Sequence, residues 1–583
     1  MKNFFNTVLA NIVAIFLVLF LFFMMTAVML VLSSLGENSA VKVKKNSVLT
    51  LDFRTNIIDS PAEDQEDFFA FNKKTKNLLV YDVLQAIKKA KTDDNIKGIS
   101  IESDHIGAGL TQLDDIRNAL EDFKKSGKFV YAYGNTVSQG SYYLGSAADQ
   151  YYLHPAGGID LKGMAAEVTF FKDFTDKYGI GVDVIRHGKY KAAVEPFLRN
   201  DISEENKEQL SVLLNDIWSN TSRKISISRK IDSAQFKTVV DSLYGFIPEM
   251  SIAHKLADKL IQKSEYDNIL KNKLKLSEKD KLNKISFSKY VKSMDDARSR
   301  GEQVAVLYAS GSINDGEGYD NIYSRDFVKY IKDLADDDKV KAVVFRINSP
   351  GGSANASDEI LFELSELKKK KPLIVSFGDY AASGGYYIAM AGDKIFSEPN
   401  TLTGSIGVFG VIPNYKELAN RNGIRTDVVE TNVNSSMYSP MRGLNPNAMD
   451  MMSKNIEATY KRFVHHITKN RKKAFEQIDE VGGGRIWSGT RAKQLGLVDE
   501  LGTLQDAIDY AAKQAKLSSY NVSSYPKTKT QFEILFEDMN EDDISAKILK
   551  NKLGEDKFKT FEMLTNPKAD RSVMMELPYR LSF

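Results

Sequence analysis

A serine at a turn of small residues is the first position in this chain that could do chemistry. Ser383 follows an apolar run, residues 373–375, which predicts a strand, and it precedes residues 384–391, which predict a helix. Gly384 and Gly385 would let another backbone approach closely, and free N–H groups at a helix start favour negative charge. Ser383 could therefore be a nucleophile beside an oxyanion site, or it could simply cap the helix.

A serine nucleophile needs a base, because its hydroxyl attacks weakly until a neighbour removes the proton. Histidine is the usual base, but no Gly-x-Ser-x-Gly elbow occurs at a strand–helix turn of this chain. That argues against a triad of the α/β-hydrolase type. No His-Glu-x-x-His motif or cluster of carboxylates with histidine indicates a metal site, so neither a metal nor another cofactor is expected.

The elements that would position such a site come from an internal repeat. A shift of 244 positions carries Gly134 onto Gly378 and the pair Tyr142-Tyr143 onto Tyr386-Tyr387, and it holds without a gap over about a hundred residues. Each copy alternates buried-strand runs with helical spacing. In the second copy, the strands are predicted at residues 340–348, 372–377 and 394–397, with a helix at 356–370. This alternation is typical of parallel α/β units.

The two copies differ at the positions that matter for chemistry. Ser383 aligns with Gln139, so the candidate nucleophile exists in the second copy only. Lys191 aligns with Ser435, and the nearby Lys189 also has no lysine counterpart. One half thus offers a nucleophile and the other a base, which suggests one site assembled from both. Alternatively, the two lysines are ordinary solvated loop residues.

Lysine acts as a base only when it is neutral. Its ordinary pKa is about 10.4, so it must be buried or held by polar partners. The hydroxyl of Ser405, in the second half, could serve as such a partner. The paired Gly351-Gly352, directly after a predicted strand, could present N–H groups to a ligand oxygen.

Composition narrows the class of protein. The 583 residues contain 79 Lys+Arg and 77 Asp+Glu, a balance that argues against a nucleic-acid-binding protein. The chain has no cysteine. Disulfides, thiolate catalysis and cysteine-ligated metal centres are therefore excluded.

The start of the chain predicts a membrane anchor. Residues 8–32 carry no charge and are nearly all apolar, which is long enough to span a bilayer. A cleavable signal peptide is the alternative, but residues 33–36 are a weak cleavage site. Lys42, Lys44 and Lys45 outnumber Lys2, so local charge alone would keep the following chain in the cytoplasm.

Four motifs carry a resemblance to a known family. The motifs are Asn348-Ser-Pro-Gly-Gly-Ser, Ala381-Ala-Ser-Gly-Gly-Tyr-Tyr, Thr403-Gly-Ser-Ile-Gly-Val and Tyr190-Lys-Ala-Ala-Val-Glu-Pro-Phe. Together they resemble the long, duplicated form of the signal peptide peptidase A family. Its members are serine–lysine peptidases with a crotonase/Clp-protease-like fold. The resemblance extends from the anchor to about residue 517.

The resemblance implies a role for each matching residue. Ser383 is expected to be the nucleophile and Lys191 the general base and later proton donor. The motif favours Lys191 over Lys189, and Ser405 matches the hydroxyl that orients the lysine. The oxyanion hole is assigned to the backbone N–H groups of Gly352 and Gly384.

The resemblance also implies an architecture and a substrate. The expected fold is α/β, with two tandem crotonase/Clp-protease-like repeats after one N-terminal transmembrane helix. The predicted divisions are an anchor at 1–40, a first repeat with the lysine at 41–275, a linker at 276–300, a second repeat with the serine at 301–517, and a tail without a role at 518–583.

The implied function is degradation of cleaved signal peptides and other hydrophobic peptides at the bacterial inner membrane. The implied assembly is a homotetramer with its catalytic mass on the periplasmic side, against the weak lysine count near the span. Two alternatives stay open: a catalytically silent membrane scaffold, and a crotonase-like acyl-thioester enzyme.

Overall fold

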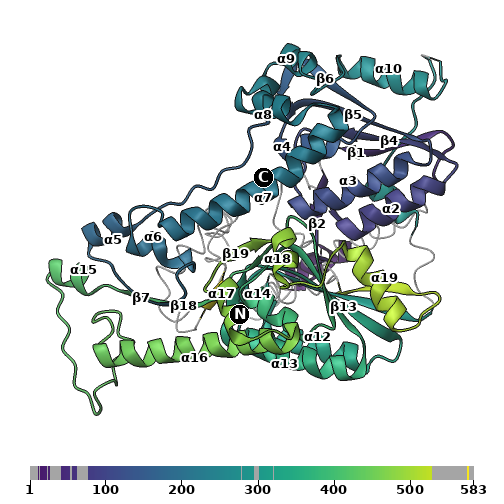
Figure 1. Cartoon of the computed structure of the whole chain (residues 1–583). Coiled ribbons are helices and arrows are strands. Elements are labelled where there is room, and N and C mark those ends of the chain that lie inside the picture. Colours follow the sequence, from purple (N-terminus) through teal and green to yellow (C-terminus); the bar gives the residue numbers. More distant parts are fainter. Residues whose placement is uncertain are drawn as a thin grey trace.

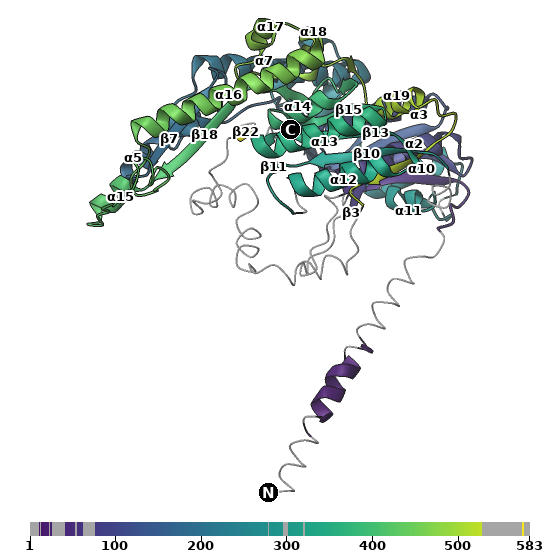
Figure 2. The same cartoon turned by 90° about the horizontal axis from the view of Figure 1, so that it is seen from below.

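The computed structural model describes residues 11, 13–22, 24–25, 41–52, 55–61, 76–277, 279–294, 301–318, 321–527 and 574–576. Residues 13–22 are helical and exposed, and Figure 2 shows this segment apart from the rest of the molecule. The predicted anchor at residues 8–32 lies partly outside the described ranges. Within those ranges, no helix has both the length and the apolar character that crossing a membrane requires.

The first half of the chain forms a sheet with the strand order β8-β6-β5-β4-β1-β9. Its parallel centre consists of β1 (Ser47–Asp52), β4 (Ile96–Glu102), β5 (Phe129–Val137) and β6 (Gln150–Ile159), with β8 (Lys259–Leu260) and β9 (Lys284–Ser286) at the edges. The helices of this half are α2 (Val80–Thr92), α3 (Leu110–Lys124), α4 (Gln139–Gly145), α8 (Ser233–Asp241), α9 (Pro248–Ala253) and α10 (Lys263–Lys273). Continuous apolar strands fit a parallel sheet whose two faces are both covered.

The second half repeats this order. Its central strands are β10 (Gln303–Ser310), β13 (Val340–Ser349), β15 (Leu373–Ala382) and β16 (Lys394–Ser397), which pair in parallel. The helices are α12 (Ser324–Asp336), α13 (Ala354–Lys370), α14 (Gly384–Ile388), α17 (Phe475–Val481), α18 (Gly489–Leu495) and α19 (Leu504–Gln514). The starts of β13, β15 and β16 lie 244 positions after those of β4, β5 and β6, so the predicted α/β repeat is confirmed. Figure 1 shows the sheet and helices of the first half, coloured purple to teal, above those of the second half, coloured teal-green to yellow.

Two predicted boundaries need correction. The predicted linker at 276–300 contains β9, which joins the first sheet by pairing with β1, and α11 (Phe287–Lys292), which packs against that half. Ile285 of β9 and Tyr290 of α11 are buried in its core. The predicted tail at 518–583 begins with β21 (Asn521–Tyr525), which pairs in parallel with β10. Both segments are rich in polar residues, so the sequence did not indicate that some of their side chains are buried.

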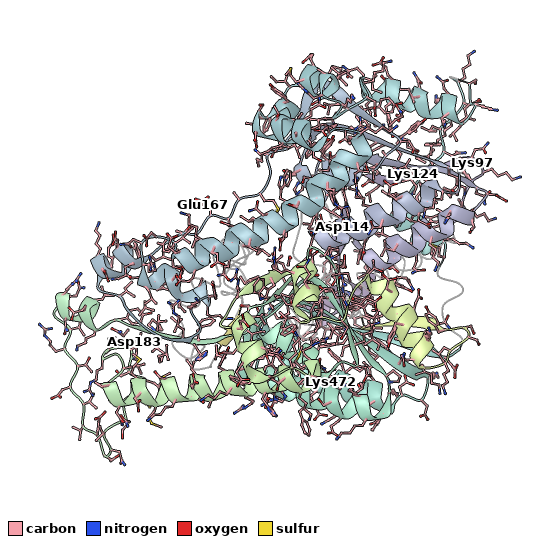
Figure 3. All side chains as sticks on the ribbon, in the orientation of Figure 1. Lys97, Asp114, Lys124, Glu167, Asp183 and Lys472 are labelled. Carbon is pink, nitrogen blue, oxygen red and sulfur yellow. The ribbon has the colours of Figure 1, made fainter. Side chains whose placement is uncertain are left out.

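Two arms extend from the sheets and meet each other. One contains α5 (Lys172–Tyr178), β7 (Gly181–His187), α6 (Glu195–Leu198) and the long α7 (Glu204–Arg229); the other contains β18 (Val408–Asn414), α15 (Lys416–Arg421) and the long α16 (Pro446–Arg471). Figure 1 shows both arms reaching to the left of the sheets. Asp183, labelled in Figure 3, joins them by accepting a hydrogen bond from Asn414 at 3.1 Å.

Short strands complete the second half. They are β11 (Ile313–Asn314), β12 (Ile322–Tyr323), β14 (Gly351–Ser353), β17 (Leu402–Gly404), β19 (Ile486–Ser488), β20 (Glu500–Leu501) and β22 (Met574–Glu576). A third sheet has the order β12-β11-β14-β22-β18-β7 and so joins residues from both halves. The remaining described pair is β2 (Thr55–Ile58) with β3 (Lys76–Leu79).

Buried charges hold the two halves together. Arg346 is fully buried and contacts Asp59 of the first half at 3.0 Å and Glu398 of the second at 3.3 Å. Opposite charges at this distance raise the pKa of Arg346 despite its burial. Thr111, at the start of α3, donates its backbone N–H to Asp379 of β15 at 2.9 Å. These contacts fix the position of β15, the strand that leads to Ser383.

Candidate active site

The antiparallel pairing of the two arms brings Lys191 beside Ser405. In this pairing His187, the last residue of β7, lies opposite Val408, the first residue of β18. Residues that follow β7 therefore lie beside residues that precede β18. Lys191 comes four positions after His187, and Ser405 comes three positions before Val408.

Ser383 lies at the junction between β15 and α14, as the sequence predicts. Its backbone has φ 55° and ψ −118°, a conformation that side-chain-bearing residues rarely adopt, and its N–H donates to the carbonyl of Gly404 at 2.9 Å. The Ser383 hydroxyl makes no capping hydrogen bond to α14. Its placement is therefore not explained by helix capping.

The amine of Lys191 lies within hydrogen-bonding distance of three oxygen atoms. Nζ is 2.8 Å from Ser383 Oγ, 3.0 Å from Ser405 Oγ and 3.2 Å from the carbonyl oxygen of Ser405. All three residues are fully buried. These three oxygens carry no charge, and burial of an amine disfavours its ammonium form, which is the condition that a lysine base requires.

Lys189, the second candidate base, is not part of this arrangement. It is exposed, and its Nζ lies 5.1 Å from the ring centre of Tyr190. Lys191 and Ser383, which lie 2.8 Å apart, come from one chain: Lys191 follows β7 and Ser383 follows β15. The structure therefore brings the two candidate groups, Ser383 and Lys191, together within one chain.

A glycine turn at residues 482–484, which the sequence analysis did not single out, packs against the backbone of Lys191. Gly484 packs so closely that a Cβ there would lie 2.5 Å from the Lys191 backbone nitrogen. The carbonyl of Gly483 accepts the N–H of Tyr190 at 3.0 Å, and the carbonyl of Arg485 accepts the N–H of Ser405 at 2.7 Å. The turn thus contacts the chain on both sides of the dyad. Three consecutive glycines, at 482–484, were the available signal.

The two glycines assigned to the oxyanion hole lie on elements in contact, β14 and α14. Gly352 has φ 153°, and a Cβ there would lie 2.1 Å from the carbonyl oxygen of Ile313, so no side chain fits. Gly384 is the first residue of α14, where backbone N–H groups have no partner within the helix. Such N–H groups can stabilise an oxygen that gains negative charge.

These groups are suited to acyl transfer. A hydroxyl in hydrogen-bonding contact with a buried amine can be deprotonated as it attacks a carbonyl carbon, and nearby backbone donors can hold the resulting oxyanion. The arrangement requires no cofactor for these steps.

Comparison with known proteins identifies the family. The model of peptidase family S49 matches residues 122–277 and 365–518, one stretch in each half, and the Clp protease model matches residues 297–403. Protease 4 of Salmonella typhi is 35% identical over 87% of this chain and 84% of its own length. Protease 4 of Haemophilus influenzae is 34% identical over 85% of this chain and 83% of its own length. The chloroplastic serine protease SPPA of Arabidopsis thaliana is 31% identical over 82% of this chain and 70% of its own length. The chain belongs to peptidase family S49 and is a serine peptidase.

Proposed function

We propose that Ser383 is the nucleophile and Lys191 the general base of a membrane-anchored endopeptidase that degrades cleaved signal peptides and other hydrophobic peptides. The observation that carries the assignment of roles is the 2.8 Å contact between Lys191 Nζ and Ser383 Oγ in a fully buried setting. Ser405 orients the lysine by its own contact with Nζ at 3.0 Å. Gly352 and Gly384 supply the oxyanion hole.

The reaction follows from these roles. Ser383 Oγ attacks the peptide carbonyl while Lys191 Nζ takes its proton, and the two glycine N–H groups hold the oxyanion. Nζ then gives the proton to the leaving amine, which leaves an acyl-enzyme on Ser383. Water attacks this ester while Nζ takes its proton, and Nζ then gives that proton to Ser383 Oγ as the C–Oγ bond breaks and the acid product departs. One oxyanion donor is worth roughly 3 kcal/mol in this chemistry.

The membrane part of the proposal rests on the N-terminal segment and on the family resemblance. Residues 8–32 are uncharged and long enough to span a bilayer. We place this span in the bacterial inner membrane, with the catalytic halves on the periplasmic side. Protease added to spheroplasts should digest the halves; their protection until the membrane is opened would refute this topology.

A homotetramer is the proposed assembly, and the repeat supplies an argument for contacts between copies. The pairing of β7 with β18 uses one strand from each arm, whereas their repeat counterparts, residues 425–431 and 164–170, form no strand. In residues 164–170, exposed and half-buried positions alternate, and Val429 is fully exposed. We infer that residues 164–170 of one copy pair with residues 425–431 of the next.

Light scattering can test this assembly. The wild-type chain should form particles of four 65.3 kDa copies. Val429→Pro should dissociate them, because proline cannot donate a strand hydrogen bond. Val429→Thr, which keeps both the N–H and a β-branched side chain, is the matched control and should stay assembled. Monomeric wild-type protein would contradict the inference.

Cleavage of a fluorogenic hydrophobic peptide in detergent tests the activity itself. Wild-type protein and a variant of an exposed serine, Ser519→Ala, should cleave the peptide, and Ser383→Ala should not. A Ser383→Ala variant that keeps full activity would overturn the assignment. No cleavage by folded wild-type protein would favour the scaffold, and hydrolysis of an acyl thioester alone would favour the crotonase-like enzyme.

A further inference from the structure

The C-terminal strand β22 lies between β14 and β18, two strands next to the candidate active site. Met574, Met575 and Glu576 pair in antiparallel fashion with Ser353, Gly352 and Gly351 of β14. On the other side, Met574 pairs with Phe409 of β18. Figure 2 shows β22 next to β18. A segment almost two hundred residues from Ser383 in the sequence therefore occupies a position between two strands of the site.

The two flanking strands are those that carry the proposed machinery. β14 contains Gly352, the assigned oxyanion donor, and contacts α14, which begins directly after Ser383. The ring centre of Phe409, on β18, lies 5.7 Å from Lys191 Nζ. β22 therefore lies between Gly352, the glycine assigned to the oxyanion hole, and Phe409, whose ring lies near Lys191 Nζ.

This position suits an extended peptide. Main-chain hydrogen bonds to a neighbouring strand bind peptides of many sequences, as in other cases of strand addition. Without β22, β14 would have an unpaired edge facing β18. The sequence of the segment, Val573-Met574-Met575 followed by Glu576, is mainly apolar, which is the class of peptide proposed as substrate.

With β22 in place, Ser383, Lys191 and Ser405 are fully buried. An external peptide would have to reach a serine that has no exposed surface. We propose that β22 is a peptide ligand of its own active site, so that the C-terminal segment competes with substrate and holds the enzyme in a closed, autoinhibited state. The regulatory role of β22 rests on the proposed peptidase function. Binding of the C-terminal segment to the site can be tested without any catalysis.

The binding test uses Ser383→Ala protein, which cannot cut its own segment, and a fluorescein-labelled peptide of residues 574–583. Protein that ends at residue 573 should bind this probe at least about tenfold more tightly than the full chain, because a tethered competitor acts at a high effective concentration. Protein that ends at residue 576 keeps β22 and should bind as weakly as the full chain.

Equal affinity of the full chain and the 573-residue protein would overturn the inference, as would tight binding by the 576-residue protein. If the shortened chain unfolds, Met575→Pro in the full chain replaces it, with Met575→Val as the control that keeps the backbone N–H. Met575→Pro should then bind the probe tightly and Met575→Val weakly, and the same affinity for both would refute the idea.

Kinetics separate this inference from the proposed function. With active Ser383, removal of residues 574–583 should lower KM for a hydrophobic peptide about tenfold and leave kcat unchanged. If probe binding changes as expected but no variant cleaves peptide, the ligand role of β22 stands and the peptidase assignment fails. If cleavage occurs and truncation changes neither KM nor probe binding, the ligand role fails alone.

Discussion

The glycine turn behind Lys191 gives a sharp test of how the base is positioned. A Cβ at Gly484 would lie 2.5 Å from the Lys191 backbone nitrogen, whereas ordinary contact begins at 3.4 Å. In Gly484→Ala, Lys191 must therefore retreat by about 0.9 Å, the difference between these distances. If this shift carries Nζ directly away from Ser383, the 2.8 Å contact between Nζ and Ser383 Oγ lengthens to about 3.7 Å, beyond hydrogen-bonding reach. A misplacement of this size costs roughly 100-fold in rate.

The neighbouring glycine supplies the control. Gly483 also has a positive φ, 59° against 87° at Gly484, but its Cβ would come no closer than 3.9 Å to another atom, Gly188 Cα. Both alanine variants carry backbone strain of about 1 kcal/mol, and only Gly484→Ala displaces the lysine. Peptide cleavage and melting temperature should be measured for both. A folded Gly484→Ala protein that is as active as Gly483→Ala would refute the reasoning.

Three further predictions address the dyad and the buried charges. Ser405→Ala removes one contact of Lys191 Nζ and should lower kcat about tenfold, with little change in KM. Co-expressed Lys191→Met and Ser383→Ala chains should show no recovered activity, because both groups come from one chain; recovery would place the dyad across an interface. Burial raises the pKa of Asp115 to about 7, so the folded chain holds a proton that the unfolded chain releases above about pH 4. Stability should then fall as pH rises to about 7, by up to about 1.4 kcal/mol per pH unit, and Asp115→Asn should flatten this fall in urea titrations.

The surroundings of Asp115 also support the predicted dependence of stability on pH. Asp115 belongs to α3 and is buried beside the charges that join the two halves. Among the described residues, neither of its carboxyl oxygens has a hydrogen-bond partner. An ionised carboxylate in such a position is costly, and an amide of the same shape is less so. An unchanged pH profile in Asp115→Asn would show that other groups dominate.

The sequence predicted the central part of the fold because the repeat constrained it. The predicted strands at 340–348 and 394–397 and the predicted helix after Ser383 follow from apolar runs and glycine positions that recur at a fixed shift, and the structure has β13, β16 and α14 there. The comparison of copies also singled out Ser383 and Lys191, since each is missing from the other half. The local sequence pattern was sufficient to predict a strand or helix wherever both copies of the repeat carry the same apolar and glycine positions.

Other features depend on contacts that no local pattern reports. The pairing of β7 with β18 crosses from one half to the other, so the sequence could not show how Lys191 reaches Ser405. Gly484 is needed only because the Lys191 backbone passes against it. The polar stretch around β9 was interpreted as a linker, although Ile285 is buried. β22 is three residues long and is defined by its partners alone.

Labelling with a fluorophosphonate tests the central claim most directly. Digestion and mass spectrometry should place the adduct on Ser383 in wild-type protein, where Lys191 activates the hydroxyl. Lys191→Met should abolish the adduct, and Lys189→Met, which changes an exposed lysine two positions away, should retain it. An adduct on another residue, or undiminished labelling of Ser383 in Lys191→Met, would contradict a serine–lysine site built from the two halves of this chain.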